Sequence, residues 1–191
     1  MKRFVPVLLA LSLLACKDKE GSSEEETGSF PALAFIQSQV RDVDTSLYHI
    51  HKIVEDGGHA DTTSISREQF RKEAQPFLQL PDINKSSLRD EYSESKYFDE
   101  TLQNVVYFYT AKDPEADLQR EQVFIDPNEG GGLVKKIIID LFENRNGFSA
   151  HRNLIWTSNS HFQISENAPG PGGTERIRRT RIIWNDFPSS K

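Results

Sequence analysis

The chain has 191 residues, with 23 lysines and arginines against 29 aspartates and glutamates, so its formal net charge is −6. This acidic balance argues against non-specific binding to nucleic acid and against attraction to anionic lipid headgroups. A single cysteine, Cys16, excludes a disulfide framework. Stability must therefore come from a packed core, and the length suits one domain of ordinary size.

The first 15 residues have the pattern of a secretory signal peptide. Lys2 and Arg3 precede an apolar run that extends from Phe4 to Leu14. A cationic start followed by a short apolar core is typical of such signals. The run is shorter than the roughly 20 apolar residues that a membrane-spanning helix needs. We therefore expect residues 1–15 to be a cleaved leader.

The end of this leader, Leu13-Leu14-Ala15-Cys16, resembles the lipobox of bacterial lipoproteins. The resemblance implies cleavage before Cys16, diacylation of its sulfur and acylation of the new amino group. Several acyl chains give stable anchoring where a single chain is marginal. The alternative, a soluble secreted protein, would leave Cys16 as a free thiol in an oxidising compartment. We expect a lipid anchor at Cys16 and a place in the bacterial cell envelope.

Residues 16–29 are expected to form a disordered acidic tether, because no apolar side chain follows Cys16 before Phe30. Acidic residues at this place resemble the surface-export signals of lipoproteins in Bacteroidetes-like bacteria, although Lys17 and Lys19 interrupt them. A plain solvated spacer is the alternative. Residue 17 is not aspartate, so the inner-membrane retention pattern of enteric bacteria is missing. This favours the outer membrane in a cell that has two membranes.

Two helices are predicted at the start of the domain. Apolar residues recur at alternating steps of three and four over residues 31–54. This spacing predicts one amphipathic core helix, which Gly57-Gly58 would end. A capping box, Ser66-Arg67-Glu68-Gln69, predicts a second and shorter helix that continues to about Phe77.

From residue 103 the chain consists of β-branched and aromatic runs separated by turn signals. Strands are expected over 105–110, 122–125, 134–142 and 176–184, and Asn146-Gly147 is a strong hairpin signal. The stretch 154–164 is either one long bent strand or a second hairpin around Ser158-Asn159.

Two helices followed by about five strands predict an α+β domain over residues 30–187. Its N-terminal helices would pack on one face of an antiparallel meander sheet. This element order is similar to the cystatin-like arrangement, in which a sheet cradles a helix, and the similarity is one of fold alone.

No motif predicts a catalytic, cofactor or metal site. His49 and His51 lie two apart on the predicted helix and cannot share a metal there, so we expect them at the surface. His151 and His161 could pair across strands, but acidic ligands at a defined spacing are missing. The chain has no Gly-x-Ser-x-Gly elbow, and its glycine-rich runs lack the strand–turn–helix context of phosphate-binding loops.

The most unusual local feature is a run of four arginines, Arg176, Arg178, Arg179 and Arg181. Such a cluster in an acidic protein is a candidate contact for an anionic ligand or a partner. On a strand the side chains alternate, so Arg176 and Arg178 would face one way and Arg179 and Arg181 the other. Internal ion pairing and protection of a sheet edge are the alternative roles.

The sequence leads to two hypotheses of function. The first is a membrane-anchored lipoprotein whose domain is a non-enzymatic binding or scaffold module for an envelope protein or a small ligand. It predicts an exposed patch or groove on the sheet face away from the helices. The second is an envelope hydrolase with an unrecognised polar site, and it predicts a pocket in which His151 or His161 meets a carboxylate. The oligomeric state and the membrane face stay open.

Overall fold

The computed structural model describes residues 29–128, 132–145, 148–169 and 175–185. The predicted leader, Cys16 and nearly all of the tether lie outside the described residues. Within the described ranges, no helix is both long and apolar enough to cross a membrane.

The described residues form a single large sheet and a few short helices. The helices are α1 (Ala32–Thr45), α2 (Arg67–Glu73), α3 (Gln75–Leu78) and α4 (Ser86–Arg89). The strands are β1 (Ile50–Asp56), β2 (His59–Ile65), β3 (Tyr92–Asp99), β4 (Asn104–Ala111), β5 (Leu118–Asp126), β6 (Leu133–Arg145), β7 (Phe148–Thr157), β8 (His161–Pro169) and β9 (Glu175–Ile183).

The nine strands are ordered β2-β1-β9-β8-β7-β6-β5-β4-β3 in the sheet. Every neighbouring pair is antiparallel. Strands β3 to β9 follow one another as an up-and-down meander, and the hairpin β1–β2 joins this meander at β9. The predicted α+β class and antiparallel sheet are confirmed. The prediction of about five strands is wrong, because the described part of the chain forms nine.

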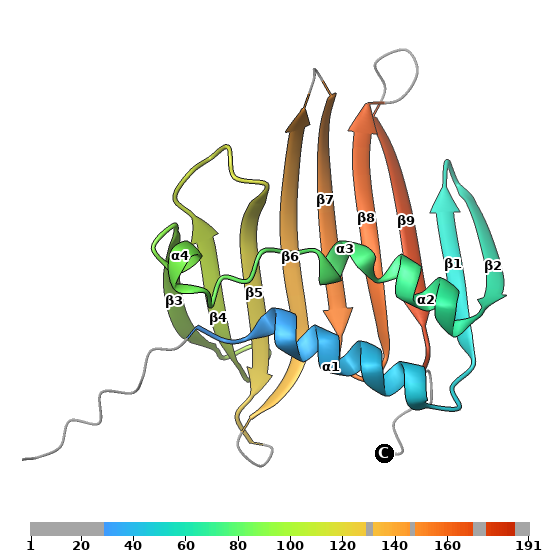
Figure 1. Ribbon diagram of the computed structural model, residues 1–191, viewed down its shortest axis with the longest axis horizontal. Coiled ribbons are helices and arrows are strands. Elements are labelled where there is room, and N and C mark those ends of the chain that lie inside the picture. Colours follow the sequence, from blue (N-terminus) through green and yellow to red (C-terminus); the bar gives the residue numbers. More distant parts are fainter. Residues whose placement is uncertain (1–28, 129–131, 146–147, 170–174, 186–191) are drawn as a thin grey trace, which may run out of the picture.

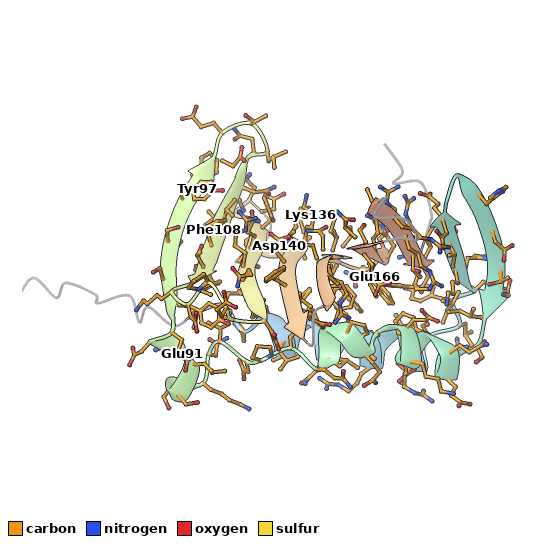
Figure 2. All side chains as sticks on the ribbon, turned by 90° about the horizontal axis from the view of Figure 1, so that it is seen from above. Glu91, Tyr97, Phe108, Lys136, Asp140 and Glu166 are labelled. Carbon is orange, nitrogen blue, oxygen red and sulfur yellow. The ribbon has the colours of Figure 1, made fainter. Side chains whose placement is uncertain are left out.

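The helices lie together across one face of the sheet (Figure 1). Seen from above, the hairpins β3–β4 and β1–β2 rise on either side of the central strands, on the side away from the helices (Figure 2). The same view places Phe108, Lys136 and Asp140 on that uncovered side. We call it the open face.

An aromatic cluster fills the space between the sheet and the helices α2 and α3. Phe77 packs edge-on against Trp156 with ring centroids 5.1 Å apart, and Phe70 packs against Trp184 at 5.5 Å. Phe162 stacks on Trp156 at 5.2 Å. All five side chains are buried. Because side chains alternate along a strand, this cluster fixes which residues of β7, β8 and β9 face the helices and which face outward.

The first helix is shorter than the apolar spacing predicts. It ends at Thr45, and Leu47, which continues the predicted stripe, is 96% exposed. Residues 50–56 form β1 instead of the last turns of the helix. Ile50 and Val54 keep helical spacing by coincidence, but this segment is also rich in β-branched residues, which favour strands. Gly57-Gly58 forms the β1–β2 turn with positive φ angles of 56° and 83°, rather than a helix end.

The capping box of the second helix is confirmed. The Ser66 hydroxyl accepts from the Gln69 amide, and the Gln69 side chain accepts from the Ser66 amide. The predicted second helix is divided into α2 and α3, and Pro76 lies in the first turn of α3. A hairpin at Ser158-Asn159, one of the two predicted alternatives, joins β7 to β8. Asn146-Gly147 lies outside the described residues, although Arg145 and Phe148 on either side of it pair with each other.

The point where the chain enters the domain is held by hydrogen bonds on the helix side. The Phe30 amide donates to the Tyr109 hydroxyl at 2.8 Å, and the Asn84 side-chain amide donates to the Phe30 carbonyl at 2.9 Å. The Ser29 hydroxyl donates to the Asn84 side-chain oxygen at 3.0 Å. Burial raises the pKa of the Tyr109 phenol, so the group that receives the Phe30 amide stays protonated. We call these four residues the entry clamp.

Candidate binding groove

The open face contains a groove with a volume of about 730 Å³. Strands β4 to β9 contribute to it, so the groove runs across the middle of the sheet. Its outward-facing side chains are mostly polar, with one aromatic and one aliphatic residue. They are Phe108, Thr110, Arg120, Asp140, His151, Asn153, Ser165, Asn167, Ile177 and Arg179.

Six of these residues form one continuous line across the sheet, which we call the polar row. Each pairs directly with the next one on the neighbouring strand, in the order Thr110, Arg120, Asp140, Asn153, Ser165 and Arg179. Cross-strand partners lie on the same face with their Cβ atoms about 5 Å apart, so the six side chains are in reach of their neighbours. Glu55 of β1 continues the row beyond Arg179.

Hydrogen bonds fix one end of the polar row. Arg120 Nε donates to Asp140 Oδ2 at 3.0 Å, and Asn153 Nδ2 donates to Asp140 Oδ1 at 2.7 Å. Both oxygens of the Asp140 carboxylate are thus engaged. An anchored carboxylate of this kind orders its neighbours, because charge-assisted hydrogen bonds are the stronger class.

The other end of the polar row contains Arg179. Its Nη1 donates to Glu55 Oε2 at 2.7 Å. Its Nε is shielded from solvent and has no hydrogen-bond partner among the described residues. A buried donor without an acceptor costs about 1–3 kcal/mol. Between Arg179 and Asn153 stands Ser165, whose hydroxyl accepts from Gln163 Nε2 at 3.2 Å.

Two other charged residues border the groove but direct their side chains to the opposite face. Arg152 forms an ion pair with Glu143, and it pairs in register with Leu141 of the helix-facing set. Glu166 pairs in register with Arg152 and Arg178, and it follows the buried Ile164 by two residues. By strand alternation both side chains belong to the helix side.

The two histidines that could have paired across the strands are far apart. His151 pairs with Asn167, whereas His161 pairs with Thr157, six residues further along β7. That separation is roughly 20 Å along an extended strand, so the suggested pairing is wrong. The His161 ring nitrogens lie 3.0 Å from Ser160 Oγ and 3.4 Å from Thr157 Oγ1.

His151 lies in the groove without the partner that an acid–base role needs. Its ring packs on Phe142 with centroids 4.6 Å apart. The nearest carboxylate of the polar row, Asp140, has both oxygens occupied by Arg120 and Asn153. Among the described residues, His151 forms no hydrogen bond with a carboxylate. His49 and His51, which were predicted on the first helix, lie outside the groove. His49 precedes β1, His51 lies on β1, and both are exposed.

The four arginines of β9 divide between the two faces as alternation predicts. Arg176 donates to Asp56 from both Nε and Nη2, at 2.7 and 2.6 Å, and this pair lowers the pKa of the Asp56 carboxyl. Arg178 borders a small hollow beside α2. Arg179 lines the groove, and Arg181 pairs with Gln163 on the open face. The structure therefore brings only Arg179 into the groove.

A buried carboxyl, Glu121 on β5, lies on the opposite face of the sheet. Its side chain is 4% exposed and pairs across the sheet with Tyr109 and Ile139. Burial, together with the nearby negative charge of Asp82, raises the pKa of Glu121 to about 8. Burial also raises the pKa of Tyr92 to about 12. Because Glu121 faces the helix side, it is not part of the groove.

No group of three or more histidine, cysteine, aspartate or glutamate side chains arranged to hold a metal ion is found in the described ranges. Comparison with known proteins gives no relative: no protein-family model matches the chain, no curated protein is significantly similar in sequence, and no solved structure matches.

Sequence reasoning missed most of the groove. It marked Arg179 as a candidate anion contact and His151 as a possible cross-strand partner of His161. It did not single out Arg120, Asn153 or Ser165, which are ordinary polar residues in ordinary strand positions. Only the register of six strands, which no local pattern contains, aligns them.

Proposed function

We propose that the protein is a lipid-anchored, non-enzymatic binding module of the bacterial cell envelope, and that its ligand occupies the groove on the open face. The groove is the observation that carries this proposal. Its volume of about 730 Å³ lies within the roughly 300–1,000 Å³ of small-molecule sites. The proposed anchor rests on the lipobox pattern that ends at Cys16.

The chemistry of the groove supports binding more than hydrolysis. A hydrolase would need a base aligned with its nucleophile and oriented by a third group. Here His151 packs on Phe142, and Asp140 is bound by Arg120 and Asn153. An ordered set of polar groups around a concave surface instead provides orientation and specificity for a ligand.

The anchor is tested by replacing Cys16. We expect Cys16→Ser to move the protein from the membrane fraction to the soluble fraction, because the acyl chains have no other attachment point in this proposal. The domain should keep the melting temperature of the detergent-solubilised parent. Fractionation of the native cells, with mass spectrometry of the N-terminal peptide, measures both location and acylation. A Cys16→Ser protein that still sediments with membranes would exclude the lipid anchor.

The binding role is tested by filling the groove. The Ser165→Trp variant places a large ring in the centre of the polar row. We expect small molecules that are extracted from the wild-type protein, purified from its own envelope, to be absent from this variant. Mass spectrometry of the extracts measures the difference.

The matched control places the same ring outside the groove, at the exposed Thr63 of β2. Thr63→Trp should retain the bound compound at the wild-type level. If the wild-type and Ser165→Trp extracts have the same composition, the groove is not the binding site and the proposal fails.

A further inference from the structure

Two arginines, Arg120 and Arg179, bring N–H donors to the groove. The backbone groups of its floor are used in the sheet ladders between neighbouring strands. The Asp140 carboxylate already accepts from Arg120 and Asn153. Among the described residues, the Glu166 carboxylate belongs by strand alternation to the helix side, and the Glu55 carboxylate beside Arg179 accepts from Arg179 Nη1 through Oε2. The described carboxylates at the groove are therefore each paired with an arginine or directed to the helix side.

Arg179 supplies the strongest of these donors. Its ion pair with Glu55 uses Nη1, and among the described residues Nε has no acceptor although it is shielded from water. A guanidinium presents its N–H groups in a fixed planar fork that fits the oxygens of carboxylate or phosphate. Because Nε is closed to solvent, a ligand in the groove reaches Arg179 through its other N–H groups, and the side chain as a whole is 42% exposed.

The neighbours of Arg179 extend this donor set toward the middle of the groove. Ser165 is its direct cross-strand partner, and the Ser165 hydroxyl, which accepts from Gln163, still has its own proton to donate. At the far end of the row, Arg120 bonds to Asp140 through Nε, which leaves its terminal nitrogens without a partner in the described part of the chain. The groove thus has a guanidinium toward each end, and each guanidinium is paired with one carboxylate.

We propose that the ligand carries an anionic oxygen group, a carboxylate or a phosphate, which accepts hydrogen bonds from Arg179 and Ser165. This inference rests on the proposed binding role of the groove and adds the chemical class of the ligand. Of the four arginines of β9, it assigns the contact to Arg179 alone. Arg176 is already held by both oxygens of Asp56 on the other face.

The test titrates the full-length protein in detergent micelles with sodium phosphate, sodium succinate and glucose. Ionic strength is kept constant with sodium chloride, so that general screening does not change. Isothermal calorimetry measures the affinity. We expect at least one anion to bind and glucose not to bind. The anion that binds more tightly identifies phosphate or carboxylate as the preferred group.

The variants separate a specific contact from general charge. Arg179→Gln should weaken anion binding about tenfold or more, since a charge-assisted pair is lost. Ser165→Ala should weaken it by a smaller factor. Arg176→Gln removes the same charge from the same strand on the other face and should leave the affinity unchanged. Arg179→Lys keeps the positive charge but loses the planar guanidinium, so its anion affinity should be intermediate. This variant replaces Arg179→Gln in the test if the glutamine variant does not fold.

Three outcomes would overturn the inference: neither anion binds, glucose binds as well as the anions, or Arg176→Gln weakens binding as much as Arg179→Gln. The extraction experiment distinguishes a wrong assignment of the ligand class from a wrong assignment of the groove as a binding site. If an uncharged compound is lost on Ser165→Trp but is retained in Arg179→Gln, the groove is a binding site and the ligand is not an anion.

Discussion

Replacing Trp156 with alanine is expected to lower the free energy of unfolding by about 4 kcal/mol, because large-to-small changes of buried aromatic residues cost about 3–5 kcal/mol. Trp156 is fully buried, and Phe77, Phe162 and Trp184 all have ring centroids within 5.1–5.4 Å of it. Its removal would leave a cavity at the place where α3 contacts the sheet. Urea unfolding followed by circular dichroism measures the change.

A second substitution at the same position makes this prediction sharper. Trp156 Nε1 is buried and has no hydrogen-bond partner within the described part of the chain. Trp156→Phe removes this unpaired donor and keeps an aromatic ring, so its cost should be less than half that of Trp156→Ala. As a control, Tyr97→Ala removes an aromatic ring that is 48% exposed, and the change should stay within about 1 kcal/mol. Equal costs for alanine and phenylalanine at position 156 would contradict the cavity argument.

The Glu121→Gln variant is expected to be more stable than the wild-type protein at pH 7 by about 3 kcal/mol, because pH 7 lies about 2.5 pH units above the ordinary glutamate pKa and each unit corresponds to about 1.4 kcal/mol. The pKa of Glu121 is about 8 in the folded protein, against an ordinary glutamate pKa of 4.5. Below the unfolded pKa both states hold the proton, and the group has no effect on stability. Between the two pKa values the unfolded state releases its proton while the folded state retains it, so stability falls as the pH rises through this window.

Glutamine removes this dependence, since it stays neutral at every pH in the window. Wild type and Glu121→Gln should therefore have similar stability at pH 4 and separate progressively toward pH 8, as measured by urea unfolding at each pH. The exposed Glu115 provides the control, and Glu115→Gln should leave the pH profile unchanged. A Glu121→Gln protein that is less stable than the wild type by the same amount at pH 4 and pH 7 would show that a specific hydrogen bond outweighs the desolvation of Glu121.

The elements that could be predicted from the sequence are those with strong local signals. The capping box at Ser66 predicts α2, because both of its hydrogen bonds lie within four residues. The β-branched and aromatic runs predict β4 and β6 for a similar reason, since residues of these types favour strands. In these cases the residues that decide the structure are adjacent in the sequence.

Two of the three missed strands, β2 and β3, lie at the edges of the sheet. Strand β2 is exposed over residues 59–64 and contains no alternation of apolar and polar residues. Strand β3 contains Tyr97 and Phe98, each 48% exposed, within a polar segment. Edge strands have one paired neighbour and little core contact, so their sequences show little of the pattern that identifies a central strand. Strand β1 was missed because Ile50 and Val54 continue the spacing of α1.

The candidate site was the least predictable part, and the reason is again distance along the chain. Arg120 and Arg179 belong to one line of residues only because five consecutive strands keep their registers. The sequence predicts a groove or patch on the sheet face away from the helices. This expectation requires only that the helices pack on one face of the sheet. The identity of the groove residues depends on pairing, which no local pattern reveals.

The entry clamp has a mechanical consequence. If Cys16 is held in a membrane, any pull along the tether reaches the domain at Phe30, which Tyr109 and Asn84 hold on the helix side. The tether of residues 17–29 can extend at most roughly 45 Å, because each residue spans no more than about 3.5 Å. A load applied there acts on the helix side of the sheet, where Tyr109 of β4 lies, whereas the groove lies on the opposite face.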